Sequence, residues 1–246
     1  MKLRLLAAGR GGHAIVVVPG FLTQADELGR WVPALRSSGF GGDIWSVGWK
    51  SGSPSELGGC AATALVGLAP IVFGVSTAVT IPPVLVGTAA RARSYWRSKV
   101  ELARRIAPQV CRALLRLRAR YRYREITLIA HSLGVELTWA MVEGARSLPA
   151  NRFVLLGGAS SATDGCWDAL DIDADVYNVG HRGDRVLQFF YQFAEGELPL
   201  GLADAGGQII NVDVGHLHLG TFGHDYSRVF AEFGAPLRWR PRQFGR

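Results

Sequence analysis

Apolar residues in the chain occur either in continuous runs or at helical spacing. Runs of about four to eight apolar residues bounded by turn residues are typical of strands buried on both faces of a parallel sheet. Such runs predict strands at residues 13–19, 43–49, 126–130, 152–158, 175–180 and 208–214. Apolar residues three and four positions apart predict helices at residues 25–38, 91–123, 133–144, 185–193 and 226–233. This alternation predicts a single α/β domain over residues 1–246, with a mostly parallel central sheet flanked by helices.

The strand at residues 126–130 runs directly into a serine with small residues on both sides. The turn reads Ala130, His131, Ser132, Leu133 and Gly134, a G-x-S-x-G pattern with alanine in the first glycine position. This pattern is typical of a nucleophile elbow, a strand-to-helix turn so sharp that it excludes larger side chains two residues before and after the nucleophile. A serine at an ordinary helix N-cap is the alternative. Strand, turn and helix follow in the required order, so we predict that Ser132 is a nucleophile.

The first buried strand ends in a loop suited to an oxyanion hole. Residues 13–19 are followed by Gly20, which lets the chain turn so that the N–H of Phe21 or Leu22 faces the elbow. We choose the Phe21 amide, with the Leu133 amide as its partner. A plain turn at the end of a strand is the alternative.

An acidic residue follows the predicted strand at residues 175–180. Asp184 lies where proteins with a nucleophile elbow place the carboxylate that orients a catalytic histidine. Asp184 could instead cap the helix at residues 185–193, and the two roles are compatible. Asp164 and Asp175 are weaker candidates, because neither follows the end of a strand.

Three histidines follow the last predicted strand, and each keeps the chain order Ser, Asp, His. They are His216, His218 and His224. We prefer His224 as the base, because its loop has room to return to Ser132 before the closing helix begins. His216 and His218 form an H-x-H pair that could bind a metal on an extended segment, but further ligands are not evident. We therefore expect no metal and no cofactor.

Residues 57–90 contain no charged side chain. A membrane-spanning helix needs about 20 apolar residues. A single crossing would separate strands that must pair in one sheet, so we expect either an apolar lid or a re-entrant hairpin that turns at Pro70 or at Pro82 and Pro83. Residues 57–123 are thus predicted to form an apolar and basic helical insertion before the nucleophile strand.

One segment carries most of the positive charge. The chain has a formal net charge of +7, and residues 91–124 hold twelve Arg or Lys against one acid, Glu101. Pro108 is expected to kink the helix predicted here or to start a second one. Its apolar stripe comprises Trp96, Val100, Ala103, Ala107, Val110, Leu114, Leu117 and Tyr121. The basic face of residues 57–124 is either solvated or attracted to an anionic membrane surface. No nucleic-acid motif is present, so we expect no nucleic-acid partner.

Cysteine content and the first residues bear on the compartment. The three cysteines, Cys60, Cys111 and Cys166, are odd in number and lack metal spacing, which argues against a disulfide framework. Residues 1–12 hold too short an apolar run for a cleaved signal peptide. We expect a cytoplasmic protein, peripheral or re-entrant at the inner face of a membrane if residues 57–90 enter one.

The chain resembles the α/β-hydrolase-like family that includes the transmembrane and coiled-coil domain-containing proteins. The resemblance covers most of residues 13–233 and rests on the order of its motifs more than on any one of them. These are residues 20–22, the apolar insertion, and residues 132–134, 178–187, 211–214 and 223–226. It implies an α/β-hydrolase fold, a triad of Ser132, Asp184 and His224, and membrane association. Ala130 departs from the usual first glycine.

These observations predict a serine hydrolase, esterase or lipase-like, that acts on a small-molecule or lipid ester. The preference for an ester rests on fold analogy and on the apolar, basic flank. The alternative is a non-catalytic, membrane-associated scaffold or binding module on the same fold, in which the triad residues act as caps and packing groups.

Overall fold

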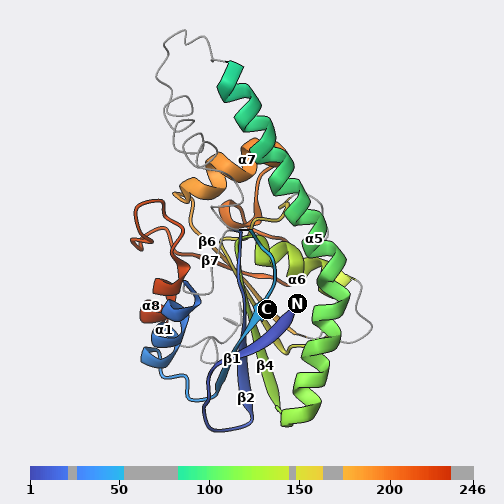
Figure 1. Cartoon of the computed structure of the whole chain (residues 1–246). Coiled ribbons are helices and arrows are strands. Elements are labelled where there is room, and N and C mark those ends of the chain that lie inside the picture. Colours follow the sequence, from blue (N-terminus) through green and yellow to red (C-terminus); the bar gives the residue numbers. More distant parts are fainter. Residues whose placement is uncertain (22–26, 53–82, 144–147, 163–173, 234–246) are drawn as a thin grey trace.

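A seven-stranded sheet forms the centre of the molecule (Figure 1). The computed structural model describes residues 1–21, 27–52, 83–143, 148–162 and 174–233. The strands are β1 (Lys2–Ala7), β2 (His13–Val18), β3 (Asp43–Gly48), β4 (Glu125–His131), β5 (Arg152–Leu156), β6 (Asp175–Gly180) and β7 (Ile210–Asp213), in the order β1-β3-β2-β4-β5-β6-β7. β1 pairs antiparallel with β3, and all other neighbours pair in parallel. The predicted α/β class with a mostly parallel sheet is confirmed.

The six predicted strands are all present, and each end lies within two residues of its predicted position. The two central strands, β2 and β4, are buried on both faces, as their continuous apolar runs predict. They pair in register up to Val18 and Ala130. Because both strands end at the same level, the residues that follow them leave the sheet side by side.

The edge strand β1 is absent from the sequence-based prediction. Leu3 and Leu5 alternate with Lys2 and Arg4, which is a strand pattern, but Leu5 is 42% exposed and adds little apolar signal. An edge strand needs only one partner, here β3, so its sequence is less constrained than that of a central strand.

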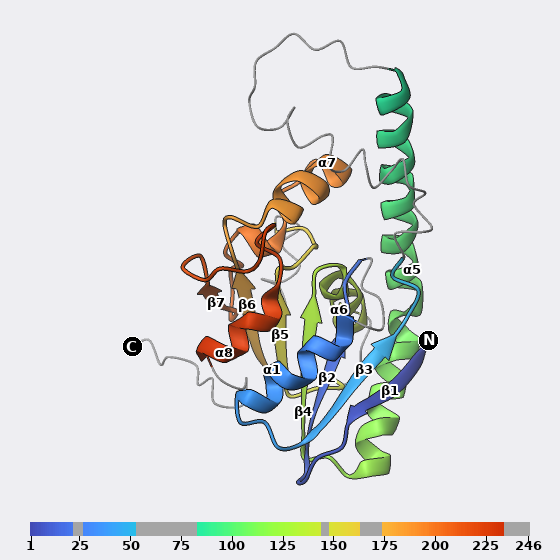
Figure 2. The same cartoon turned by 60° about the vertical axis from the view of Figure 1, so that its left-hand side comes forward.

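Helices cover both faces of the sheet (Figure 2). α1 (Trp31–Ser37) and α8 (Val229–Phe233) share one apolar cluster with one face. α5 (Pro83–Tyr121) and α6 (Leu133–Glu143) share another cluster with the opposite face. Short 3₁₀ segments lie at Glu27–Arg30, Leu200–Leu202 and Tyr226–Arg228. The helix predicted after Asp184 is a π turn at Leu187–Tyr191 followed by α7 (Gln192–Glu195).

α5 is one continuous helix of 39 residues with Pro108 inside it, so the second helix considered at that residue is not formed. At a rise of about 1.5 Å per residue the helix is about 58 Å long, and its first part extends beyond the sheet (Figure 1). The predicted stripe packs onto the domain through Trp96, Ala103, Ala107, Val110, Leu114 and Leu117, which are all buried. Tyr121, the last member of the stripe, is 45% exposed, but its ring still contacts Trp45 of β3 with ring centroids 5.3 Å apart.

Most of the apolar insertion predicted at residues 57–90 lies outside the described residues, which resume at Pro83. Among the helices that the structure does describe, none combines the length and the apolar character needed to cross a membrane.

Candidate active site

Ser132 occupies the turn between β4 and α6. Its backbone φ is 53°, in the left-handed region that residues with a side chain rarely adopt. Hydrogen bonds on both sides hold it there: its N–H donates to Leu156 O at 3.0 Å, and its carbonyl accepts from Val135 N and Ala159 N. A strained residue that its surroundings hold in place is often a functional one. The turn thus has the strained backbone that a strand-to-helix nucleophile elbow requires.

Contacts with β2 and its loop explain the small residues around the turn. A Cβ atom at Gly134 would lie 2.4 Å from Val18 O, and one at Gly20 would lie 2.6 Å from Ser132 Cβ. Neither position accepts a side chain. Ala130 is tolerated because it still belongs to β4, where it pairs in parallel with Val18 and Leu155.

The two predicted oxyanion donors lie next to this turn. The close approach of Gly20 to Ser132 places the loop after β2 against the serine. Leu133 is the first residue of α6, where a backbone N–H has no partner within the helix. In the described part of the chain, neither Leu133 N–H nor Phe21 N–H has a hydrogen-bond acceptor. Within the described residues, both amides therefore remain candidates for the oxyanion hole.

Asp184 and His224 form a close pair, although 40 residues separate them. His224 Nδ1 lies 2.6 Å from Asp184 Oδ2, and Asp184 is fully buried. The other carboxylate oxygen, Oδ1, accepts from Leu187 N at 3.1 Å. Asp184 therefore combines the two roles considered for it, a partner of the histidine and a hydrogen-bond acceptor at the start of a helix.

Tyr226 is a member of this cluster that the sequence analysis missed. Its hydroxyl donates to Asp184 Oδ2 at 3.1 Å, the same oxygen that pairs with His224. Burial, followed by the charge of Asp184, raises the pKa of the Tyr226 hydroxyl well above its usual value, so it remains a donor. The only sequence signal for this role is its position two residues after the histidine.

His131 is the second residue whose role was missed, since it was considered only as part of the elbow. Its ring lies 4.6 Å from that of His224, and its Nε2 is 3.2 Å from His224 O. Burial lowers the pKa of His131 well below its usual value, and the nearby charges of His224 and Arg30 lower it further. The ring is therefore neutral at pH 7, and because its partner is a carbonyl, Nε2 carries the proton and donates.

Ser132 and His224 are not hydrogen-bonded to each other in the described structure. Ser132 is 4% exposed, and the His224 side chain is 16% exposed. Hydrogen bonds between catalytic groups are often long before substrate binds. The structure thus contains an assembled Asp184–His224 pair, and His131, the residue before the strained serine, contacts His224.

An aromatic cluster adjoins the oxyanion loop. Phe21 stacks on Phe190 with ring centroids 5.3 Å apart and meets Trp96 edge-on at 5.1 Å. Phe190 belongs to the π turn that follows Asp184, and π turns are frequent at functional sites. Trp96 Nε1 in turn donates to Glu195 Oε1 at 2.8 Å, which ties α5 to α7. The loop after β2, the helical run after Asp184 and the projecting part of α5 therefore meet in one apolar wall.

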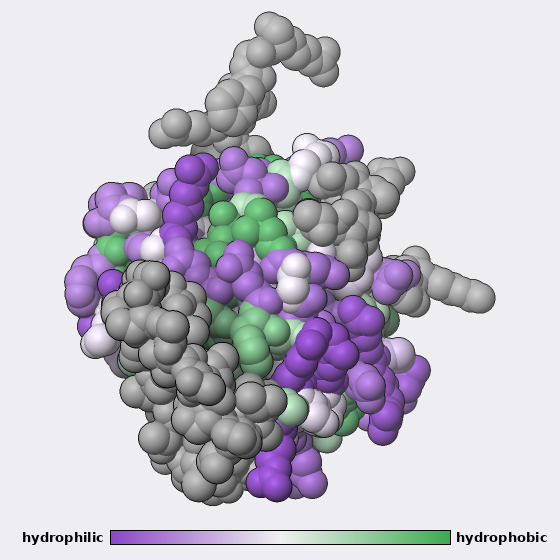
Figure 3. Space-filling view, turned by 90° about the horizontal axis from the view of Figure 1, so that it is seen from above, coloured by the Kyte–Doolittle hydropathy of each residue, from purple (hydrophilic) through white to green (hydrophobic). Residues whose placement is uncertain are grey.

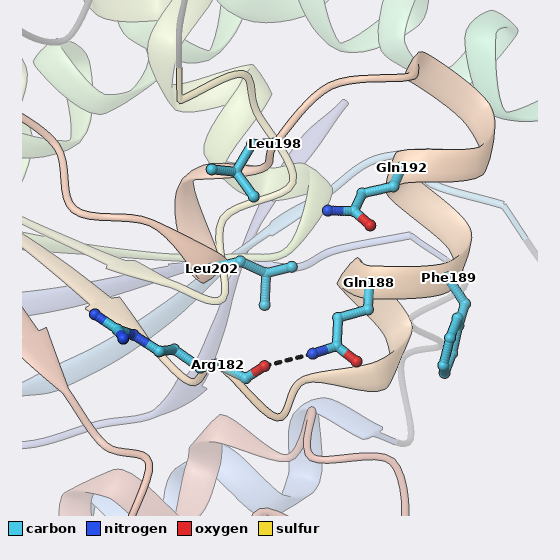
Figure 4. A pocket seen from close by; sticks show the side chains of 6 residues that line it. All are labelled: Arg182, Gln188, Phe189, Gln192, Leu198 and Leu202. Carbon is cyan, nitrogen blue, oxygen red and sulfur yellow. Dashed lines mark hydrogen bonds between the residues drawn. The ribbon is translucent and has the colours of Figure 1, made fainter. Parts of the chain in front are cut away.

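The carboxyl end of the sheet also presents apolar surface. Seen onto the end where α7 lies, hydrophobic residues form patches near the middle of the face, with hydrophilic residues between and beside them (Figure 3). A pocket of about 500 Å³ opens beside α7. It is lined by Arg182, Gln188, Phe189, Gln192, Leu198 and Leu202 (Figure 4). Leu202 also packs against the apolar cluster that contains Leu133 and Leu187.

Of the other candidate residues, those that the structure describes form no contact with Ser132, Asp184 or His224. Asp175 is at the opposite end of β6 and pairs with Arg152 at 2.8 Å. His216 and His218 are exposed, and Asp164 lies outside the described residues. Within the part of the chain that the structure describes, no group of three or more His, Cys, Asp or Glu side chains is placed to hold a metal ion.

No protein-family model matches the chain, and no curated protein matches it significantly.

Proposed function

We propose that the protein is a serine hydrolase with an α/β-hydrolase fold, in which Ser132, Asp184 and His224 are the catalytic triad. The observation that carries the proposal is the 2.6 Å contact between His224 and a fully buried Asp184, at the same edge of the sheet as the strained Ser132. The chain order Ser, Asp, His and the position of the serine after a central parallel strand also support it.

In this mechanism His224 takes the Ser132 hydroxyl proton as the oxygen attacks the ester carbonyl. Asp184 accepts from Nδ1 and so leaves Nε2 as the nitrogen that takes the proton, and it stabilises the imidazolium. The amides of Leu133 and Phe21 bind the oxyanion. His224 then returns the proton to the leaving alcohol, which leaves an acyl group on Ser132. Water, activated by the same histidine, releases that group as the acid.

The substrate we propose is an ester with an apolar acyl group. The support is the aromatic wall of Phe21, Trp96 and Phe190, because Phe21 is also the residue whose amide would contact the reacting oxygen. Apolar pockets lined by aromatic side chains with a few polar groups are typical of small-molecule sites.

A fluorophosphonate probe tests the proposal directly, because an activated serine displaces its fluoride and becomes phosphonylated. We expect peptide mass spectrometry of the intact protein, labelled in detergent, to find the adduct on Ser132. Ser160 and Ser161 are also buried near the ends of the central strands and should stay unmodified. A heat-denatured sample should not react. If folded protein carries no adduct on Ser132, the non-catalytic scaffold becomes the better account.

We further propose that the basic face of α5 contacts an anionic membrane surface. Arg105, Arg112 and Arg116 are exposed along α5. Each such charge contributes about 1 kcal/mol near an anionic surface. Replacing all three by glutamine should thus weaken binding to phosphatidylserine vesicles at low salt by about 10²-fold, measured by co-sedimentation. The triple lysine variant keeps the charge and should bind like the parent. The proposal fails if the parent does not sediment with these vesicles.

A further inference from the structure

The carboxylate of Asp184 accepts three hydrogen bonds in a fully buried position. Leu187 N donates to Oδ1 at 3.1 Å. His224 Nδ1 lies 2.6 Å from Oδ2, and the Tyr226 hydroxyl donates to the same Oδ2 at 3.1 Å. Oδ2 is therefore shared between the histidine and a second donor. Each donor stabilises the negative charge and so reduces the pull that the oxygen exerts on the other donor's proton.

The fold fixes the Tyr226 ring in a specific slot. Tyr226 is fully buried, and its ring lies directly against Gly157 at the end of β5. A Cβ atom at Gly157 would lie 2.3 Å from Tyr226 Cε2 and 2.7 Å from Cζ. Gly157 also has a φ of 51°, which favours glycine. The backbone thus leaves room for an aromatic ring at this place and holds the hydroxyl against the carboxylate.

We propose that Tyr226 is a positioning residue for the base: by sharing Asp184 Oδ2 with His224, it holds the carboxylate in place and limits how strongly the carboxylate favours the imidazolium. The proposal rests on the function proposed above. Tyr226 acts on His224 through Asp184. The Tyr226 and His224 rings meet edge-on with centroids 5.7 Å apart, but no hydrogen bond joins the two side chains in the described structure.

The sign of the effect follows from the geometry. Without the Tyr226 hydroxyl, Oδ2 has a single donor and attracts the His224 proton more strongly, so His224 becomes protonated at a higher pH. The other ionisable or charged residues near the pair are His131, His181, Arg30, Asp213 and Asp225. His131 is neutral at pH 7, and the others are not altered by the substitution.

The experiment compares Tyr226→Phe with a matched control, Tyr123→Phe. Tyr123 is also a buried tyrosine whose hydroxyl donates to a carboxylate, that of Asp43, but it lies after α5 at the other end of the sheet. Titration of the histidines by ¹⁵N NMR, with His224 assigned from a His224→Gln variant, reads the base directly. We expect the His224 midpoint to rise by about half a pH unit in Tyr226→Phe and to stay unchanged in Tyr123→Phe.

Activity supplies a second readout. The acid limb of the pH profile of kcat/KM should move upward with the NMR midpoint, and kcat/KM at its optimum should fall by about tenfold, as for the loss of one hydrogen bond to a charged group. A fluorotyrosine at position 226 is a stronger donor and should lower the His224 midpoint. This protein replaces Tyr226→Phe in the test if the phenylalanine variant does not fold. The proposal would be overturned if the His224 midpoint stayed unchanged in both the Tyr226→Phe protein and the fluorotyrosine protein. Because the NMR readout needs no turnover, it stands apart from the test of hydrolysis.

Discussion

Replacing Ser132 by alanine should lower kcat for ester hydrolysis by about 10⁶-fold, the size of loss seen when a serine nucleophile is removed from a complete triad. Alanine keeps the Cβ atom, and the backbone hydrogen bonds to Leu156, Val135 and Ala159 do not involve the hydroxyl. The turn should therefore survive with its left-handed φ, and only the attacking oxygen is lost. The measurement is kcat with a short and a long acyl ester, together with the melting temperature.

Ser160→Ala is the matched control for this substitution. Ser160 is 3% exposed and follows β5, and its hydroxyl donates to Glu136 Oε2 at 2.8 Å. The loss of this hydroxyl should lower stability by about 1.5–3 kcal/mol, as for a hydrogen bond to a charged group, but leave kcat near that of the parent. If Ser132→Ala retained a tenth of the parent's activity, Ser132 would not be the nucleophile, and the Asp184–His224 pair would need another role.

The parts of the fold that the sequence predicted are those where burial alone decides the residues. β2 and β4 lie in the centre of the sheet, so their residues are apolar on both faces and predict buried strands. Other features depend on contacts that periodicity does not record. The π turn at Leu187–Tyr191 adds a residue to a helical turn without changing the apolar pattern of its sequence. The helix through Pro108 is held by the burial of its neighbours Ala107 and Val110.

In the candidate site, too, some residues could be predicted from the sequence and others could not. The motifs around Ser132, Asp184 and His224 could be found because each follows the end of a strand, and parallel strands bring their carboxyl ends to one edge. In the structure His224 Nδ1 lies 2.6 Å from Asp184 Oδ2. Tyr226 and His131 could not be found in this way, because their roles depend on where a ring lies after folding. No spacing in the sequence marks a tyrosine that shares an oxygen with a histidine.

Asp184→Asn is expected to lower kcat by about 10⁴-fold, for a reason specific to the three donors around this carboxylate. An amide has one oxygen, whereas both carboxylate oxygens are used here. If the asparagine oxygen faces His224 and Tyr226, its NH₂ group faces Leu187 N–H. If the asparagine oxygen faces Leu187 N–H, the NH₂ group meets the His224 Nδ1–H. The His224 ring must then adopt the tautomer with the proton on Nε2, which cannot accept the serine proton. In either orientation, the NH₂ group of the asparagine faces another hydrogen-bond donor in a fully buried site.

The same argument predicts a cost in stability of about 1–3 kcal/mol, since one buried donor is left without an acceptor. Asp225→Asn is the control: Asp225 adjoins the histidine in sequence, but its carboxylate binds Ser227 and Arg228 instead. We expect this variant to keep kcat within a few-fold of the parent. Steady-state kinetics and thermal unfolding of both variants test the assignment. Equal losses of activity in the two would mean that general negative charge near His224, and not the shared oxygen of Asp184, supports the base.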